Sequence, residues 1–175
     1  MRSESDGDRI HSFMAALGQR VQGAGTIYFT GGATAVLHGW RSSTIDIDLK
    51  AAPEPTGFFE AIAVLKDELD VNVELASPDD FIPEIPGWRE RSLFIARHGS
   101  VDFFHYDPYG QALSKLERRH DRDVNDVHAM KQKGLIDAGK LWDFFEMIEP
   151  QIIRYPAVDS RSFRLAVARF CKANG

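Results

Sequence analysis

The chain has 175 residues, 43% of them hydrophobic and 27% charged, which is an ordinary composition for a globular protein with one sizeable core. Its formal net charge of −5 excludes a polycation that binds nucleic acid through its average field, so any such contact needs a local basic surface. The single cysteine, Cys171, excludes an internal disulfide framework and a cysteine-built zinc site.

No stretch of the sequence predicts a leader or a membrane segment. The first residues lack the apolar run of a signal peptide, and no window approaches the roughly 18 apolar residues that a spanning helix needs. We therefore expect a cytoplasmic protein with no membrane partner.

Hydrophobic spacing in the first part of the chain predicts helices and strands in mixed order. Expected strands occupy residues 26–30, 44–50 and 71–75, and a hairpin over residues 92–106 turns at His98-Gly99. Expected helices occupy residues 8–22, residues 33–39 and the stretch that opens near Thr56, and a proline-rich loop covers residues 76–88.

The last third of the chain predicts helices alone. The expected helices are residues 107–119, 121–134, 137–149 and 159–172. We therefore predict an α/β (α+β) fold, with a mixed-sheet core in residues 1–107 and a C-terminal helical region in residues 108–175 that packs on it.

Two aspartates stand one residue apart in the strand expected at residues 44–50. Because alternate residues of a strand point to the same face, Asp46 and Asp48 project together, while Ile45, Ile47 and Leu49 are expected to face the core. Two carboxylates so close repel each other unless a cation or a shared proton neutralises them, and Mg²⁺ prefers such oxygen ligands. The alternative is a half-exposed edge strand that carries two solvated acids.

Two adjacent glycines precede the acid pair at a strand-to-helix turn. At Gly31 and Gly32, backbone N–H groups and the positive end of a helix can receive a phosphate, and the absence of a Cβ allows close approach. Arg41, Ser43 and Thr44 add donors suited to phosphate oxygens just before the acids. The alternative for the glycines is a tight turn with no ligand.

The stretch TGGATAVLHGWRSSTIDIDL, which begins at Thr30, resembles the signature of the nucleotidyltransferase superfamily, whose fold is that of DNA polymerase beta. That signature is G-G or G-S, about a dozen residues, and then D-x-D. The stretch is most similar to AbiEii-type and MenT-type toxins and their short relatives, in which glycine commonly replaces the serine, as Gly32 does here.

The superfamily takes a third carboxylate from a later strand, and two residues of this chain are candidates. Asp102, in the second strand of the expected hairpin, matches the family's order of elements, so the resemblance implies that it completes the metal site. The alternative for Asp102 is a strand-end acid beside a Gly-Ser turn. Glu74 is the rival, because it shares a strand face with Asn72.

A second resemblance lies downstream, in a lysine followed by R-D-x-x-D. It implies that Lys115 meets the phosphates of the nucleotide and that Asp126 lines the site, with Arg122 and Asp123 as weaker members. The alternative is a solvated charged helix face, because these residues also fall at helical spacing.

Together these resemblances imply a Mg²⁺-dependent enzyme that moves a nucleoside monophosphate from a nucleoside triphosphate to an acceptor hydroxyl. Two Mg²⁺ ions are expected on Asp46, Asp48 and Asp102, with Mn²⁺ as an alternative, and the implied nucleotide-binding residues are Thr30, Gly31, Gly32, Arg41, Ser43, Thr44, Lys115 and Asp126. The resemblance implies a tRNA 3′ end as acceptor and an antitoxin protein as partner, in a toxin–antitoxin or phage-defence system. Two alternatives stay open: transfer to a protein or small molecule, and a binding module without catalysis.

Residues 151–175 carry five basic side chains and one acid, Asp159. Arg161, Arg164, Arg169 and Lys172 can share one helical edge, which would suit an RNA backbone. The alternative is a cationic face on a packing helix.

Overall fold

The computed structural model describes residues 2–175 and divides the chain into two compact units. The first unit holds the described residues through Ser77 together with Ser92–Tyr106, and the second unit holds Pro78–Arg91 and Asp107–Gly175. The sequence pattern predicted one division, after residue 107. The segment Pro78–Arg91 differs from that expectation, because it belongs to the second unit.

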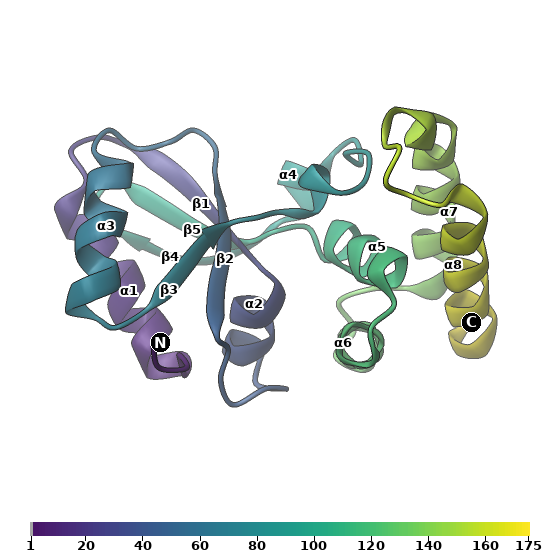
Figure 1. Cartoon of the computed structure of the whole chain (residues 1–175), viewed down its shortest axis with the longest axis horizontal. Helices are drawn as coiled ribbons and strands as arrows, with labels where there is room; N and C mark the ends of the chain where they lie inside the picture. Colours follow the sequence, from purple (N-terminus) through teal and green to yellow (C-terminus); the bar gives the residue numbers. More distant parts are fainter. Residues whose placement is uncertain (1) are drawn as a thin grey trace. The chain divides into compact units, whose positions relative to one another are not determined.

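The first unit is built on a five-stranded mixed sheet with strand order β3-β2-β1-β5-β4 (Figure 1). Its strands are β1 Gly25–Thr30, β2 Asp46–Ala51, β3 Asn72–Leu75, β4 Leu93–His98 and β5 Val101–His105. β1 pairs antiparallel with β2 and parallel with β5, while β2 pairs parallel with β3, and β4 antiparallel with β5. The prediction of an α/β fold with a mixed sheet is confirmed.

Three helices contribute to the core on one face of this sheet. They are α1 Gly7–Arg20, α2 Gly31–His38 and α3 Phe58–Glu68. Phe29 of β1 and Leu49 of β2 are fully buried in this core, together with Phe13 of α1 and Leu65 of α3. The burial of these large side chains is the main source of stability for the unit.

The alternation of side chains turns every second strand residue to the other face, which we call the acid face. Asp46 and Asp48 point to it from β2, whereas Ile47 between them is fully buried in the core. The prediction for Ile45 was wrong, because this side chain is 55% exposed. Strand β2 begins only at Asp46, so the strand alternation does not extend to Ile45.

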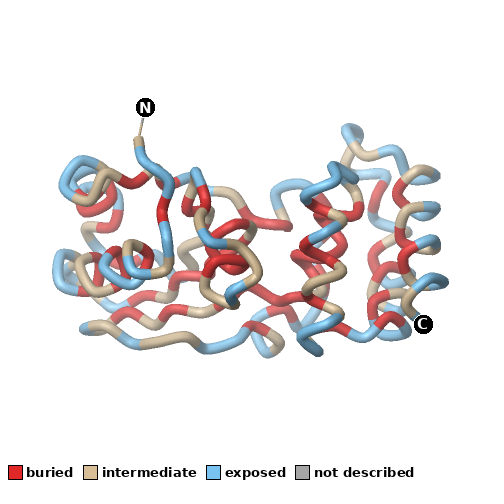
Figure 2. Tube along the Cα trace, turned by 90° about the horizontal axis from the view of Figure 1, so that it is seen from below, coloured by how far each residue is buried: buried red, intermediate tan, exposed pale blue. Residues whose placement is uncertain are grey.

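The second unit is helical in the residues described. Its helices are α4 Trp88–Arg91, α5 Pro108–Arg118, α6 Asp121–Gln132, α7 Ala138–Ile148 and α8 Ser160–Asn174, with short 3-10 helices η1 Pro78–Asp80 and η2 Glu149–Arg154. Figure 2 shows buried residues recurring along these helices, as expected for amphipathic elements that pack on one another. Phe145 of α7 meets Phe163 of α8 edge to face, with ring centroids 4.9 Å apart.

One ion pair links the proline-rich segment to α5 of the second unit. The Arg91 guanidinium lies 2.9 Å from the carboxylate of Asp107, which is fully buried and caps α5 by accepting a hydrogen bond from the Tyr109 N–H. Arg91 also stacks over the Phe144 ring of α7. Burial raises the pKa of Asp107, although the Arg91 hydrogen bond and charge oppose that shift.

Among the helices of the described residues, none combines the length and the apolar character needed to cross a membrane.

Candidate active site

Three carboxylates meet on the acid face where β2 and β3 run side by side. Asp48 is directly opposite Glu74, and Asp46 is opposite Asn72. Ligand oxygens of Asp46, Asp48 and Glu74 all lie within 4.8 Å of one another. The Asn72 amide donates a hydrogen bond to Asp46 Oδ1, which fixes the orientation of that carboxylate.

This acid cluster, Asp46, Asp48 and Glu74, has the chemistry of a site for a hard divalent cation. Mg²⁺ and Mn²⁺ both take carboxylate oxygens, and neighbouring carboxylates lose their mutual repulsion when a cation lies between them. Strand β2 is an inner strand of the sheet, so it is not the edge strand of the alternative, and the three acids on β2 and β3 fit a divalent cation by their chemistry.

Gly31 brings the start of α2 against the acid cluster. It has a positive φ of 57°, which glycine adopts without strain, and a Cβ built on it would lie 3.0 Å from Asp48 Oδ2. The strand-to-helix turn and the Asp48 carboxylate are thus in direct contact, as the sequence spacing indicated.

Gly32 permits a second close approach. A Cβ at this position would overlap the Thr44 side chain and lie 3.3 Å from a guanidinium nitrogen of Arg41. The Arg41 side chain therefore reaches back to the first turn of α2, where its charge adds to the positive end of the helix. Arg41 and Ser43 are half-buried beside this turn.

Two threonines predicted as nucleotide ligands have backbone partners in the structure. The buried Thr44 hydroxyl donates to the carbonyl of Asp46 at 3.0 Å, and the buried Thr30 hydroxyl donates to the carbonyl of Ala76 at 3.1 Å. Thr30 makes no side-chain cap on α2. Both hydroxyls position the backbone around the acids, and Thr30 ties β1 to the chain that follows β3.

The structure does not bring Asp102 to the acid pair. Asp102 is level with Thr26 on β1, whereas Asp48 is level with Thr30. Four residues of strand separate these levels, about 13 Å at 3.3 Å per residue. The Asp102 carboxylate instead lies 3.4 Å from the Arg97 guanidinium of β4, so the third acid of this site is Glu74.

Lys115 and Asp126 do lie together, within the second unit. Their charged groups are 2.7 Å apart, and the two residues are only 5% and 2% exposed. Asp123 lies 3.7 Å from the same ammonium group and also pairs with Arg118. Burial opposes ionisation of Asp123, but the Arg118 hydrogen bond and charge, with smaller effects of Lys115 and His120, lower its pKa. The nucleotide-binding role implied for Lys115 stays a prediction, and its ammonium is already paired in this structure.

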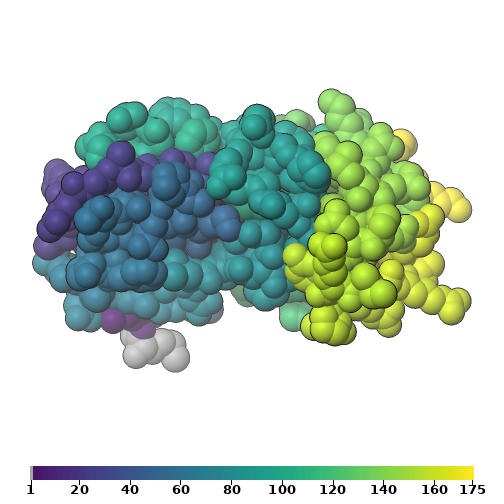
Figure 3. Space-filling view, turned by 90° about the horizontal axis from the view of Figure 1, so that it is seen from above, coloured from purple at the N-terminus to yellow at the C-terminus, as the bar shows by residue number. Residues whose placement is uncertain are grey.

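The basic edge predicted near the C-terminus is present on α8, which is drawn in yellow where it reaches the surface in Figure 3. Arg161, Arg169 and Lys172 are exposed on this helix. Arg164 instead pairs with Glu149 at 2.6 Å and stacks over the Trp142 ring. All four cationic side chains of α8 are exposed, and Arg164 also has an ion pair and a ring contact within the second unit.

Sequence reasoning missed a stack of rings beside α2. His105, at the end of β5, is buried, lies 3.0 Å from the Thr34 hydroxyl and stacks on His38, which in turn stacks on Trp40. Burial, with a smaller effect of His38, lowers the pKa of His105 to about 3. Its imidazole is therefore neutral at physiological pH. The spacing of His38 on the helix gave no signal that a later strand would meet it.

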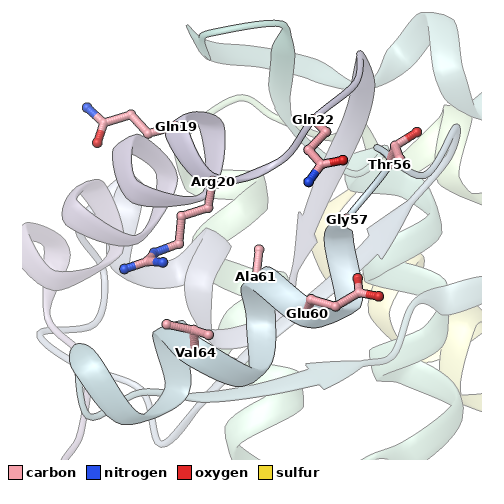
Figure 4. A pocket seen from close by; sticks show the side chains of 8 residues that line it. All are labelled: Gln19, Arg20, Gln22, Thr56, Gly57, Glu60, Ala61 and Val64. Atoms are coloured by element: carbon pink, nitrogen blue, oxygen red, sulfur yellow. The ribbon is translucent and has the colours of Figure 1, made fainter.

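A pocket elsewhere in the first unit lies between the last turn of α1 and the first turns of α3 (Figure 4). Its polar lining includes Gln19, Gln22, Thr56 and Glu60, and its arginine, Arg20, pairs with Glu68. It contains none of the residues of the acid cluster.

The glycine turn against an acid cluster on a mixed sheet is the arrangement expected of a nucleotidyltransferase. A family model described as "Nucleotidyltransferase of unknown function (DUF6036)" matches residues 8–173, and the chain belongs to this family. Searches of curated proteins and of solved structures each gave no match. The prediction of the superfamily is confirmed, and the closer resemblance to AbiEii-type and MenT-type toxins stays a prediction.

Proposed function

We propose that this protein transfers a nucleoside monophosphate from a nucleoside triphosphate to an acceptor hydroxyl, with Asp46, Asp48 and Glu74 as the metal-binding acids. The observation that carries the proposal is the contact between the two parts of the site. Gly31, at the start of α2, approaches a carboxylate oxygen of Asp48, which itself lies beside Glu74. A phosphate bound at the helix start would therefore adjoin the acids.

The chain's own residues supply the positioning that phosphoryl transfer requires. Bound Mg²⁺ would neutralise charge on the transferred phosphate and on the leaving pyrophosphate. The first turn of α2 and the Arg41 guanidinium would hold the phosphate oxygens, since both are positive. The acceptor oxygen forms a bond to the α-phosphorus, the bond from that phosphorus to the bridging oxygen breaks, and pyrophosphate leaves. We assign Glu74, the most exposed acid of the cluster, to take the hydroxyl proton.

The finer parts of the proposal rest on the family resemblance and on surface charge. We propose two Mg²⁺ ions, a tRNA 3′ end as acceptor, and a toxin activity restrained by an antitoxin protein. The support on the molecule is the α8 edge with Arg161, Arg169 and Lys172, because exposed cations of this kind favour a phosphate backbone.

The test is transfer of radioactive label from each of the four α-labelled nucleoside triphosphates, with Mg²⁺ and total tRNA. We expect label on RNA with the unmodified protein and none with Asp46→Asn, which removes one charge at constant size. Asp102→Asn is the matched control, because it lies on the same sheet face but away from the acid cluster. It should retain transfer.

Each other outcome has a distinct meaning. Label on protein, or on an added small molecule, would change the acceptor and leave the chemistry in place. No label in any fraction, despite measurable nucleotide binding that persists in Asp46→Asn, would overturn the catalytic proposal and leave a binding module.

A further inference from the structure

A row of aromatic side chains crosses the acid face next to the acid cluster. Tyr28 of β1 is level with Lys50 of β2 on one side and with Phe104 of β5 on the other, and Phe104 is level with Phe94 of β4. These four residues share one level of the sheet. Strand alternation therefore points all of them to the face that carries Asp46 and Asp48.

The three rings of this row touch one another. Tyr28 and Phe104 stack with centroids 5.5 Å apart and an interplanar angle of 29°. Phe94 meets Phe104 edge to face at the same centroid separation, with an angle of 79°. Such offset and edge-to-face pairs hold each other's orientation, so the row is a pre-formed surface.

Exposure increases along the row toward the edge of the sheet. Tyr28 is 5% exposed, Phe104 is half-buried, and Phe94 on the edge strand is 60% exposed. The core face buries its phenylalanines completely, as at Phe29 and Phe103. Large rings turned outward on the face that carries a candidate catalytic site form an apolar surface that can serve in ligand contact.

The row lies at a defined distance from the acids. Lys50 is two residues from Asp48, about 6.6 Å along the strand, and Phe94 is three strands from β2, about 14 Å across at 4.8 Å per strand. Phe94 is thus about 16 Å from the acid cluster, by combining those two spacings. That separation exceeds one nucleotide, and Lys50 supplies a cation on the path.

We propose that Phe94 and Phe104 form a stacking platform for an unpaired nucleobase near the end of a single-stranded acceptor. The inference rests on the proposed nucleotidyl transfer and extends it to the form of the substrate. Every base has a π-face, so exposed aromatic rings beside cations bind single strands with little sequence preference. The row is continuous with the acid cluster on one sheet face, which favours the substrate of that cluster over an unrelated protein partner.

The experiment measures binding without turnover. Asp46→Asn protein, with Mg²⁺, is titrated into a short single-stranded RNA that carries 2-aminopurine close to its 3′ end, and quenching of its fluorescence reports stacking. The double variant Asp46→Asn, Phe94→Ala should bind the RNA about 5- to 150-fold more weakly than Asp46→Asn alone, the equivalent of the 1–3 kcal/mol that one stacked base contributes. Phe94→Tyr should bind normally, whereas Phe94→Leu should resemble the alanine variant.

Phe59→Ala is the matched control. Phe59 is 54% exposed on α3. The Phe59→Ala variant therefore loses a comparably exposed ring of the same unit and leaves the aromatic row intact. It should leave binding and quenching unchanged. A second arm measures the affinity of the protein for Mg²⁺–ATP and for inorganic triphosphate. If Phe94→Ala lowers the affinity for ATP but not for triphosphate, the base on the platform is that of the incoming nucleotide.

Two outcomes would overturn the platform. In the first, the Asp46→Asn protein binds an RNA with an abasic site at the probe position as tightly as it binds the intact RNA. The other is a change of sedimentation in Phe94→Ala with RNA binding intact, which would show that the ring joins two copies of the chain through β4. Because binding is read in a variant without turnover, neither result depends on the label-transfer test of the proposed function.

Discussion

Asp48 of β2 and Glu74 of β3 are directly opposite each other on two parallel strands, and their carboxylate oxygens lie within metal-ligand reach. The residues two positions upstream, Asp46 and Asn72, form the neighbouring opposed pair, with a hydrogen bond from the amide to the carboxylate. The D-x-D motif of β2 thus pairs residue by residue with the N-x-E motif of β3, and β3 supplies the third acid of the cluster.

Glu74→Gln should reduce both metal affinity and nucleotidyl transfer by at least about tenfold, the lower end of the effect seen when groups around a metal site are changed. The substitution keeps the size of the side chain and removes its charge. Titration with Mn²⁺, followed by its electron paramagnetic resonance signal, measures the affinity directly. Asp102→Asn should leave the Mn²⁺ affinity unchanged, and a loss there equal to that of Glu74→Gln would contradict the assignment of the third acid.

Gly32→Ala should destabilise the protein by about 1–3 kcal/mol, because the new Cβ overlaps the Thr44 side chain in a packed site. Urea unfolding measures the loss. The double variant with Thr44→Ala should be less destabilised than the sum of the single variants, since both changes act on one contact. Gly7→Ala is the control: its Cβ would meet only Val36, at 4.0 Å, so its stability should be unchanged or slightly raised.

Lys115→Ala should destabilise the second unit by about 3–5 kcal/mol, because it leaves the buried carboxylate of Asp126 without its cation. Thermal or urea unfolding tests this value. Arg20→Ala breaks the comparable but exposed pair with Glu68 and should cost no more than about 1 kcal/mol. If Lys115→Ala unfolds as the unmodified protein does but loses nucleotide affinity, the phosphate role of the lysine gains support over a structural one.

His105 should make stability fall as the pH drops below about 6.5. The pKa of the buried ring is about 3, below its ordinary value of 6.5. Between these two values the ring is protonated in the unfolded chain and neutral in the folded chain. Its contribution is complete above pH 6.5 and is lost toward pH 3, at about 1.4 kcal/mol per pH unit within that window. Unfolding free energies at about pH 7.5 and pH 5.5 should therefore differ less in His105→Gln than in the unmodified protein, and equal differences would contradict the buried neutral ring.

The sequence predicted much of this protein because its signals are local. Helical spacing located α1 and α8, strand alternation located β2, and the glycine turn with the acid pair identified the class of enzyme. The third acid could not be chosen in the same way. Asp102 and Glu74 both stand in strands, and only the strand order and register decide which one reaches Asp48.

Contacts between distant residues account for the other differences. The Arg91 guanidinium meets the buried Asp107 across sixteen positions of sequence, and this pair is one of the contacts that link the proline-rich segment to the second unit. Likewise, Thr44 packs under Gly32 and bonds to the Asp46 carbonyl, so its hydroxyl serves the backbone although its neighbours suggested a phosphate ligand. Neither relationship has a periodic pattern in the chain.

The alternating side chains of strand β2 couple formation of the hydrophobic core to formation of the acid cluster. Ile47 and Leu49 are fully buried on one side, while Asp46 and Asp48 point to the other. A shift of this strand by one residue would turn both carboxylates into the apolar core and both hydrophobic side chains into water. A molecule that assembles β2 out of register therefore loses its hydrophobic core together with the acid cluster. Slippage of this strand thus gives no stable form of the first unit that lacks only the cluster.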